Sequence, residues 1–416
     1  MSMHFARRAV FRMLENLRHG TLEIVCPDTT YSFGEGDLCA SIRVHHERFF
    51  SRVLWGGADA AGDSYMDGDW SSPDPVAAVR LAVRNLRDLE GANPILTLAS
   101  RFFDRLRHRA NRNSIAGSQR NIHAHYDLSN AFFRLFLDRS MVYSSAVYEQ
   151  ASDSLEKAQS EKLDRICRKL RLDPSDHVLE IGTGWGAFAL HASRNYGCKV
   201  TTTTISRQQY DQAGEAFAEA GEAGTRIRLL LEDYRNLKGS FTKLVSIEMF
   251  EAVGLEYYDA FFSTCDRLLT PDGSLAMQTI TMNEHRFDAY SRRSDWIQKR
   301  IFPGGQLASV REILNSLVRS THLSMYHLED LGLHYAATLA EWRRRFHQEG
   351  GQVRALGFDE SFCRMWDYYL ASCEGTFRER HVSVIQLMLT KNGNQSILYG
   401  EPWRQAGTVA VSGASL

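Results

Sequence analysis

The sequence predicts an α/β protein with a doubly wound, mostly parallel sheet, preceded by a smaller N-terminal α+β domain. From residue 155 onward, strand-like runs alternate with helical patterns, which is the order that builds a parallel sheet. Residues 20–60 instead contain short β-like runs between Pro-Asp and Gly-Glu-Gly turns, which indicates a small separate sheet. A chain of 416 residues is long enough for two such domains.

The N-terminal domain is predicted to span residues 1–115. Its first helix has apolar side chains on one face, so it either packs on its own domain or lies on an anionic membrane surface. Helical patterns resume around residues 75–110. Residues 101–120 contain six arginines and one acid, so this linker either contacts lipid phosphates or is a solvated amphipathic segment. The domain is a candidate membrane-binding or dimerisation module.

The larger domain is predicted over residues 116–392, and residues 393–416 are typical of a loose C-terminal tail. A helix near residues 155–170 precedes the first strand, "HVLEIG" (177–182), which leads into a second helix. The later strands are "KVTTTTI" (199–205), "RIRLLLED" (226–233), "KLVSIEMF" (243–250) and "SLAMQTI" (274–280), with helices near 207–220 and 256–269.

Composition argues against several classes of function. The formal net charge of −1 provides no field that attracts nucleic acid, and the chain lacks an Asn/Asp-Pro-Pro-Tyr motif for an extruded base. Seven cysteines form no CxxC pair and no zinc-like spacing with histidine, which favours reduced thiols in a cytoplasmic protein without a metal site. No apolar run reaches the roughly 18–20 residues of a membrane-spanning helix, and we expect no signal peptide.

A glycine-rich turn directly follows the first strand of the larger domain. Glycines at this position let the chain turn sharply, and the next helix offers unpaired N–H groups to a ligand. The G-x-G-x-G spacing and the preceding acid differ from the dinucleotide pattern G-x-G-x-x-G. Both features suit S-adenosylmethionine (SAM), whose ammonium group a carboxylate can hold. The predicted cofactor-binding residues of this turn are Glu180, Gly182, Gly184, Trp185 and Gly186.

The second strand lacks the terminal acid that usually binds ribose hydroxyls in nucleotide-binding folds. It ends instead in "VTTTTISRQQ". The hydroxyl of Thr204 and the amide of Gln209 are therefore expected to take over that role.

Many segments between residues 120 and 392 are similar to those of the cyclopropane fatty acid synthases, including the mycolic acid cyclopropane synthases. The matching segments are "HYDLSNAFFRLFLD" (125–138), "MVYSSAVYE" (141–149), "LEKAQSEKLD" (155–164), "EIGTGWG" (180–186), "TISRQQ" (204–209), "MFEAVGLEYYDAFF" (249–262), "IFPGG" (301–305), "HYAATLAEW" (334–342) and "YYLASCEGTFR" (368–378). Residues 20–95, with "SYMDGDW" (64–70), resemble the N-terminal domain of the longer bacterial synthases.

The resemblance implies a Rossmann-like class I SAM methyltransferase that acts on the cis double bond of an acyl chain in a membrane phospholipid. By matching position, it places Tyr143 and Ser144 at the cofactor and Asp233 and Tyr234 near the adenine. An alkene is a weak nucleophile, so the site must exclude water and align the reactants. Aromatic faces, with Tyr143 and Tyr335 as the candidates, can stabilise the cation that forms.

The resemblance also implies a bound bicarbonate that removes the proton when the ring closes. The residues at its positions, which we assign as catalytic, are Glu251, Tyr335, Gln278, Ser145 and Ile280. Gln278 replaces a histidine of the family and Ser145 replaces a cysteine, so the anion site is altered. Glu248 adds a carboxylate where many relatives have glycine, and a second charge can raise the pKa of its neighbour or discourage an anion. Cys373 matches a position once considered a nucleophile, although a buried cysteine is usually inert.

The primary prediction is therefore cyclopropane formation, with SAM and bicarbonate as cofactors. Loss of the proton from a neighbouring chain carbon would instead give a methylene- or methyl-branched acyl chain. A free or carrier-bound acyl chain is an alternative acceptor, and a non-catalytic module that binds SAM or lipid is a lower alternative. We also expect peripheral membrane association, a homodimer formed through the N-terminal domain, and no nucleic-acid partner.

Overall fold

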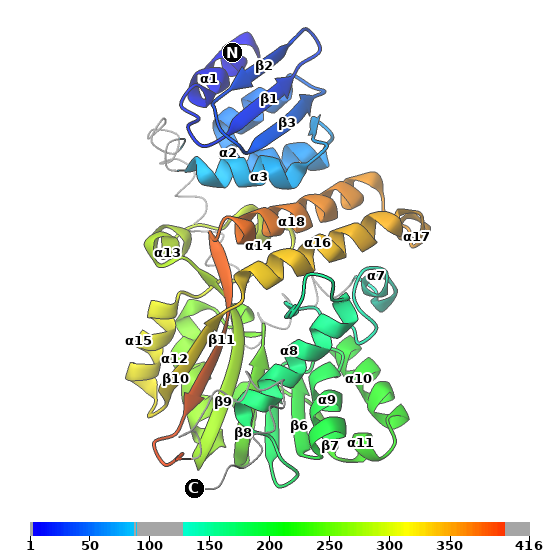
Figure 1. Cartoon of the computed structure of the whole chain (residues 1–416), viewed down its shortest axis with the longest axis vertical. Coiled ribbons are helices and arrows are strands. Elements are labelled where there is room, and N and C mark those ends of the chain that lie inside the picture. Colours follow the sequence, from blue (N-terminus) through cyan, green and yellow to red (C-terminus); the bar gives the residue numbers. More distant parts are fainter. Residues whose placement is uncertain (1–2, 87–88, 90–127, 396–416) are drawn as a thin grey trace, which may run out of the picture.

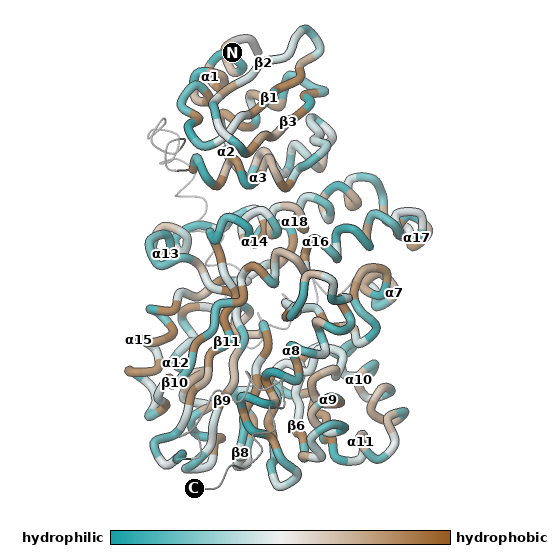
Figure 2. Tube along the Cα trace, in the orientation of Figure 1, coloured by the Kyte–Doolittle hydropathy of each residue, from teal (hydrophilic) through white to brown (hydrophobic). Residues whose placement is uncertain are grey.

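The computed structural model describes residues 3–86, 89 and 128–395 (Figure 1). The linker of residues 101–120 and the predicted boundary near residue 115 lie outside the described residues, as does all of the predicted tail after residue 395. Among the described helices, none is both long and apolar enough to cross a membrane. Figure 2 shows hydrophilic and hydrophobic residues mixed along these helices.

The N-terminal residues form a four-stranded sheet with the strand order β2-β1-β3-β4. Strand β1 pairs antiparallel with β2 and parallel with β3. The strands are β1 (Thr21–Val25), β2 (Thr30–Phe33), β3 (Cys39–Val44) and β4 (Trp70–Ser71), and the helices are α1 (Met3–Leu14), α2 (Arg48–Met66) and α3 (Pro75–Arg84). The expectation of β-structure up to residue 60 is wrong after residue 44, because residues 48–60 belong to α2. In that helix Phe50 and Leu54 are buried one turn apart, which is helical spacing.

The larger sheet has seven strands in the order β10-β11-β9-β8-β5-β6-β7. The pairs from β9 to β7 are parallel, and β11 runs antiparallel to both β9 and β10. This confirms the predicted mostly parallel, doubly wound sheet. The strands are β5 (His177–Ile181), β6 (Lys199–Thr204), β7 (Ile227–Leu231), β8 (Phe241–Ile247), β9 (Leu269–Met282), β10 (Ser324–Asp330) and β11 (Val382–Thr390).

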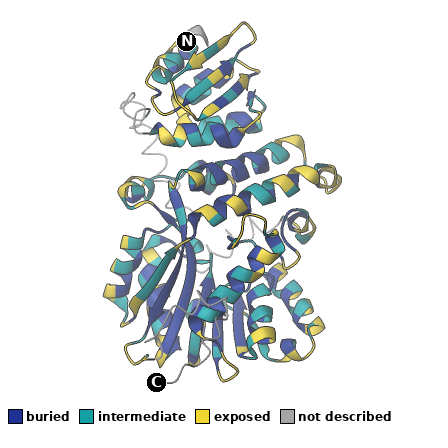
Figure 3. Ribbon diagram, viewed as in Figure 1, coloured by how far each residue is buried: buried dark blue, intermediate teal, exposed yellow. Residues whose placement is uncertain are grey.

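Helices cover both faces of this sheet, and the central strands show why. In β5, Val178 joins the hydrophobic cluster on one face and Leu179 joins the cluster on the other, as alternation along a strand requires. Figure 3 shows the central strands as buried. The helices after the gap are α7 (Asn130–Arg134), α8 (Leu155–Leu170), α9 (Ala187–Tyr196), α10 (Arg207–Glu219), α11 (Glu222–Thr225), α12 (Tyr258–Leu268), α13 (Glu284–Tyr290), α14 (Trp296–Arg300) and α15 (Val310–Ser320), with short 3₁₀ turns η1 (Tyr234–Asn236), η2 (Phe250–Ala252) and η3 (Leu255–Tyr257).

Three helices inserted between β10 and β11 separate the two sheets (Figure 1): α16 (Gly332–Gln348), α17 (Gly350–Ala355) and α18 (Glu360–Arg378). The N-terminal unit packs on α18 through α2 and α3. The Tyr65 hydroxyl donates a 2.7 Å hydrogen bond to Asp367, and Arg80 and Arg84 both pair with Glu379. One hydrophobic cluster also continues from the N-terminal sheet across α18. The small unit therefore forms part of the wall around the site described next.

Candidate active site

A cavity of about 1800 Å³ begins at the carboxyl ends of β5, β6 and β8 and reaches helix α2. Parallel sheets bind ligands at this edge, because the loops after several strands meet there. The aromatic side chains of Tyr143, Trp296, Phe302 and Tyr369 contribute to its walls. The cavity therefore joins a polar end at the sheet to a largely apolar region between α14, α16 and α18.

The glycine-rich turn forms the polar end of the cavity. The backbone N–H groups of Gly182 and Thr183 both donate to Thr203 O of β6 at 3.0 Å, which fixes the turn against the sheet. Gly186 precedes α9 with φ +92°, and a Cβ there would lie 2.6 Å from Phe217. Gly184 has φ +54°, and a Cβ there would meet nothing within 4 Å. The turn thus presents bare backbone to open space, as a bound ligand requires.

Glu180 places a buried carboxylate beside this turn. Its side chain accepts a 2.6 Å hydrogen bond from the Thr202 hydroxyl and lines the cavity. Burial raises the pKa of Glu180 to about 8, against the opposing effects of Thr202 and of the Lys162 ammonium. A buried acid with raised pKa next to a helix N-terminus suits a ligand that carries both an ammonium and a carboxylate. These residues fit the amino acid portion of SAM.

The other predicted cofactor residues lie around the same part of the cavity. The Thr204 hydroxyl donates to the Gln209 side-chain oxygen at 2.9 Å, so the NH₂ group of Gln209 points away from Thr204. Both residues line the cavity. Trp185 donates from Nε1 to the Asn130 side chain at 2.9 Å. Ten of the eleven predicted cofactor residues line the cavity: Tyr143, Ser144, Glu180, Gly182, Gly184, Trp185, Thr204, Gln209, Asp233 and Tyr234. The eleventh, Gly186, lies directly before α9.

Asp233 and Tyr234 are more constrained than the sequence suggests. Both carboxylate oxygens of Asp233 accept from Arg235, at 2.8 and 2.7 Å. The Arg235 guanidinium also lies 5.3 Å from the centre of the Tyr234 ring. An adenine contact from this loop would therefore involve the ring of Tyr234 and a carboxylate that is already paired.

Two residues of α8, Gln159 and Lys162, hold the segment that contains Tyr143 and Ser144; they lie in the family-like segment 155–164, but no local pattern predicts these contacts. Lys162 is completely buried and donates to the Ser144 hydroxyl at 2.8 Å, and Gln159 donates to Ser144 O at 2.9 Å. Burial lowers the pKa of Lys162 to about 8, against the attraction of Glu248 and nearby acids. The Tyr143 hydroxyl lies 2.9 Å from that of Tyr369. The α8 side chains therefore set the position of the backbone at Ser144 and Ser145.

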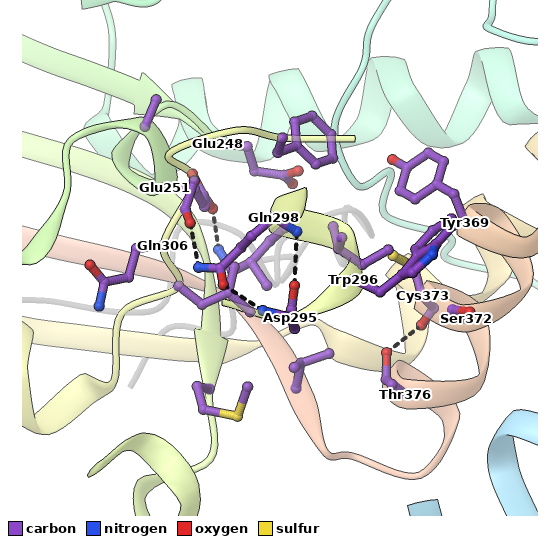
Figure 4. A pocket seen from close by; sticks show the side chains of 18 of the residues that line it. Glu248, Glu251, Asp295, Trp296, Gln298, Gln306, Tyr369, Ser372, Cys373 and Thr376 are labelled. Atoms are coloured by element: carbon purple, nitrogen blue, oxygen red, sulfur yellow. Dashed lines mark hydrogen bonds between the residues drawn. The ribbon is translucent and has the colours of Figure 1, made fainter. Parts of the chain in front are cut away.

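Glu251 lies near the start of η2 and enters the cavity from the sheet side (Figure 4). One carboxylate oxygen accepts from the backbone N–H of Ile280 at 2.5 Å and from the Thr279 hydroxyl at 3.0 Å. Among the described residues, the other oxygen is buried without a hydrogen-bond partner. Burial and the charge of Glu248 raise the pKa of Glu251 to about 8. Glu251 is therefore mainly protonated at neutral pH.

Glu248 lies at the centre of the predicted anion site. One of its carboxylate oxygens accepts from the backbone N–H of Ser145 and from the Gln278 side-chain amide, both at 2.8 Å. A hydrogen bond from the Tyr335 hydroxyl also lowers the pKa of this carboxyl group, although burial raises it overall. The predicted catalytic residues Ser145, Gln278 and Tyr335 thus converge on Glu248, whereas Ile280 binds Glu251.

The orientation of Gln278 is set by a chain of side chains through the sheet. Lys169 can only donate, and its ammonium lies 2.6 Å from the Gln386 side-chain oxygen. The Gln386 NH₂ group then donates to the Gln278 oxygen at 3.0 Å. Gln278 must therefore direct its own NH₂ group at Glu248. Gln386 stands opposite Gln278 in the β9–β11 register, a pairing that no local sequence signal reveals.

The opposite wall of the cavity carries side chains of α14 and α18 (Figure 4). Burial raises the pKa of the Cys373 thiol well above its ordinary value, so this group is not a thiolate at neutral pH. Asp295 caps α14 by accepting from Gln298 N at 2.8 Å, and burial raises its pKa to about 6. Cys373 therefore contributes to the wall rather than acting as a nucleophile.

Comparison with known proteins identifies the family of the chain. The model of the mycolic acid cyclopropane synthetase family matches residues 114–387. The chain belongs to this family. It is a SAM-dependent methyltransferase with a class I fold.

Curated relatives cover most of the chain. It is 36% identical over 389 residues to the tuberculostearic acid methyltransferase of Mycobacterium tuberculosis, covering 90% of this chain and 89% of that protein. It is also 36% identical over 361 residues to the cyclopropane-fatty-acyl-phospholipid synthase of Escherichia coli, covering 86% and 89% respectively.

Solved structures show the same relationship. A cyclopropane synthase from Mycobacterium tuberculosis is 30% identical and superposes with a TM-score of 0.61, covering 66% of this chain and 98% of that one. A mycolic acid cyclopropane synthase solved with SAH and CTAB is 33% identical, with the same TM-score and coverage.

Proposed function

We propose that this enzyme uses SAM to add a one-carbon unit to the cis double bond of an acyl chain in a membrane phospholipid, forming a cyclopropane. The observation that carries the proposal is a continuous cavity, which joins the glycine-rich turn to two buried carboxylates and to apolar walls. An acyl chain needs the apolar part of such a cavity, and a sulfonium donor needs the polar end. The Escherichia coli relative, by its name, acts on fatty acyl phospholipids.

Each part of the cavity has a task in this reaction. SAM supplies the methyl group, and Glu180 with the glycine-rich turn would hold its amino acid portion. The aromatic rings of Tyr143 and Tyr335 face the same cavity, where they exclude water and stabilise positive charge on the acyl chain by roughly 2 kcal/mol when desolvated. A proton must then leave the acyl chain. A carboxylate of the protein accepts it, since Glu248 and Glu251 both line this cavity.

A methylene- or methyl-branched acyl chain is the second candidate product. The tuberculostearic acid methyltransferase, which aligns with 90% of the chain, supports this alternative. The altered anion site around Glu248 supports it as well, because the position of the base decides which carbon loses its proton.

Lipid analysis of cells that express the protein tests the proposal. Monounsaturated phospholipid chains should gain the mass of one CH₂ group. Because a ring and a methylene branch have equal mass, hydrogenation or fragmentation must follow to separate the two products. Only ring-containing chains support the first candidate, and only branched chains support the second. Unchanged lipids, with the protein folded and SAM present, would contradict both.

We further propose that the protein binds the cytoplasmic face of the membrane through its N-terminal unit. Trp55 supports this: it is 55% exposed, lies next to the kink of α2 at Gly57, and lines the cavity. Flotation with anionic and neutral vesicles should recover the wild type, and Trp55→Ala should float less. Val318→Ala removes an 85% exposed side chain on α15 and serves as the matched control. Absence of flotation with both vesicle types would contradict the proposal.

The expected homodimer, formed through the N-terminal unit, is also retained as a proposal. Two copies joined in this way could present both cavities to one membrane surface. Sedimentation equilibrium of the full chain should give twice the mass of one chain. A monomer at all concentrations tested would contradict this assembly.

A further inference from the structure

We propose that the carboxylate of Glu248 takes the position expected for bicarbonate and serves as the proton acceptor, so that the enzyme needs no external anion. This inference rests on the proposed function, since it names the base of that reaction. It departs from the expectation that bicarbonate is a cofactor, because the residues assigned to that anion already bind a side chain of the protein itself.

The hydrogen bonds around Glu248 carry the inference. The backbone N–H of Ser145 and the NH₂ group of Gln278 both donate to one of its oxygens at 2.8 Å, and the Tyr335 hydroxyl adds a third hydrogen bond. These are three of the groups predicted to hold bicarbonate. The remaining two, Glu251 and the backbone of Ile280, bind each other at 2.5 Å. Within the described residues, the N–H groups of Ser145, Gln278 and Ile280 and the hydroxyl of Tyr335 are therefore already engaged by the two carboxyl groups of the protein.

A glutamate at position 248 costs free energy, both through its backbone conformation and through the burial of its carboxylate. Its φ is +48°, in the left-handed region, which costs an L-residue other than glycine roughly 1 kcal/mol. The carboxylate is also buried, which is costly unless a charge is paired and hydrogen-bonded. Three donors, together with the attraction of the buried Lys162 ammonium, offset that cost. A glycine at this position would avoid both penalties and would leave the space open.

The charges of the neighbouring groups decide which carboxyl can accept a proton. Glu248 has three donors and Lys162 nearby, whereas Glu251 has one oxygen with no partner among the described residues. Two buried carboxylates that repel each other do not both ionise readily, and the donors around Glu248 favour the charge on Glu248 and the proton on Glu251. The direction of the Gln278 amide, set by Gln386, also requires an acceptor at this position. A free bicarbonate would instead meet the negative charge of Glu248.

The chemical step is balanced without a further reactant. Glu248 takes one proton from the carbon that was added to the acyl chain, and the electron pair of that C–H bond forms the new C–C bond of the ring. Glu248 then holds the proton as a neutral acid until solvent reaches it. In a branched product, the same carboxylate would take the proton from a chain carbon.

The turnover of the wild type, Glu248→Gly and Glu248→Gln, measured with and without bicarbonate, tests this proposal. In decarbonated buffer with SAM and vesicles of monounsaturated phospholipid, the wild type should have the same turnover with and without added bicarbonate. Glu248→Gly should lose about 100-fold or more in turnover, as expected for removal of a general base, and should regain at least tenfold with bicarbonate. Glu248→Gln keeps the space filled without a base, so it should lose activity and show no rescue.

A binding measurement makes the test independent of turnover. Titration with ¹³C-labelled bicarbonate, followed by NMR, should show binding to Glu248→Gly and none to the wild type or to Glu248→Gln. Binding of bicarbonate to the wild type, or a wild type whose turnover depends on it, would overturn the proposal. Full activity of Glu248→Gln would overturn it as well. If no protein gives product, the proposed function fails, while the NMR result still shows whether Glu248 fills the anion site.

Discussion

Replacement of Glu180 by glutamine should weaken SAM binding while leaving the fold intact. Glutamine keeps an oxygen that can accept the hydrogen bond from Thr202, which is 2.6 Å long in the wild type, but it cannot take the negative charge that Glu180 acquires when a cation binds. A hydrogen bond to a charged group contributes about 1.5–3 kcal/mol, so the Kd should rise by roughly 10- to 150-fold. The buried carboxylate is costly to desolvate, so the variant should be at least as stable as the wild type without ligand.

The pH dependence of SAM binding follows from the same residue. Burial raises the pKa of Glu180 to about 8, so the group is mostly protonated at pH 7 when no cation is bound. Since the SAM ammonium favours the ionised carboxylate, binding should release about one proton, and affinity should increase as the pH rises from 6 to 7.5. Glu180→Gln should lose both effects.

Isothermal titration calorimetry in two buffers of different ionisation enthalpy measures the affinity and the released proton together. Thermal unfolding of both proteins controls for the fold. The reasoning would be refuted if Glu180→Gln bound SAM within twofold of the wild type, or if the wild type released no proton below pH 7.5.

Two further predictions concern stability and the role of individual residues. Gly186→Ala should lower the free energy of unfolding by about 2–4 kcal/mol, because its φ is +92° and its Cβ would also lie 2.6 Å from Phe217. Gly184→Ala should cost only about 1 kcal/mol through its φ of +54° and act mainly on SAM binding. Denaturant unfolding and calorimetry separate the two effects, and equal stability losses would contradict this. Hydrogen bonds from His347 and Tyr65 and the charge of Arg343 hold the pKa of Asp367 at about 2 despite its burial. This depressed pKa stabilises the fold by about 2 kcal/mol above pH 4, and that contribution is lost as the pH falls from about 4 towards 2. Asp367→Asn should therefore unfold at lower denaturant concentration at pH 7, and the difference from the wild type should fall to about half near pH 3 and disappear only below pH 2; an unchanged midpoint at pH 7 would contradict this.

The sequence predicted most of the larger sheet because its strands carry strong local signals. The apolar run of β5 and the glycine-rich turn after it define a buried strand, a turn and a helix without reference to the rest of the chain. The antiparallel strands β10 and β11 were not assigned, since β10 is partly exposed and lacks clear alternation. In the N-terminal unit, the aromatic and β-branched residues of 48–60 favour a sheet locally, although these residues form part of α2. Their buried side chains instead have helical spacing, with Phe49 packed against Trp70 and Phe50 against Phe11.

The candidate site was less accessible to sequence reasoning. The motif residues could be named individually, but the charge balance depends on Lys162 of α8, which reaches the site only through helix packing. The orientation of Gln278 depends on Gln386, more than a hundred residues away on a neighbouring strand. The sequence shows Glu248 as an additional carboxylate, but only its hydrogen bonds with Ser145 and Gln278 indicate that it fills the anion site. Long-range pairing of this kind leaves no pattern in a single sequence.

The central claim is that one cavity brings SAM and an acyl double bond together. Its most direct test uses purified protein, SAM carrying an isotopically labelled methyl group, and vesicles of monounsaturated phospholipid, with the lipids analysed by mass spectrometry. We predict that labelled carbon enters the acyl chain at the former double bond, and that Glu180→Gln slows this transfer at limiting SAM. Protein that binds SAM and the vesicles yet leaves every acyl chain unlabelled would contradict the account.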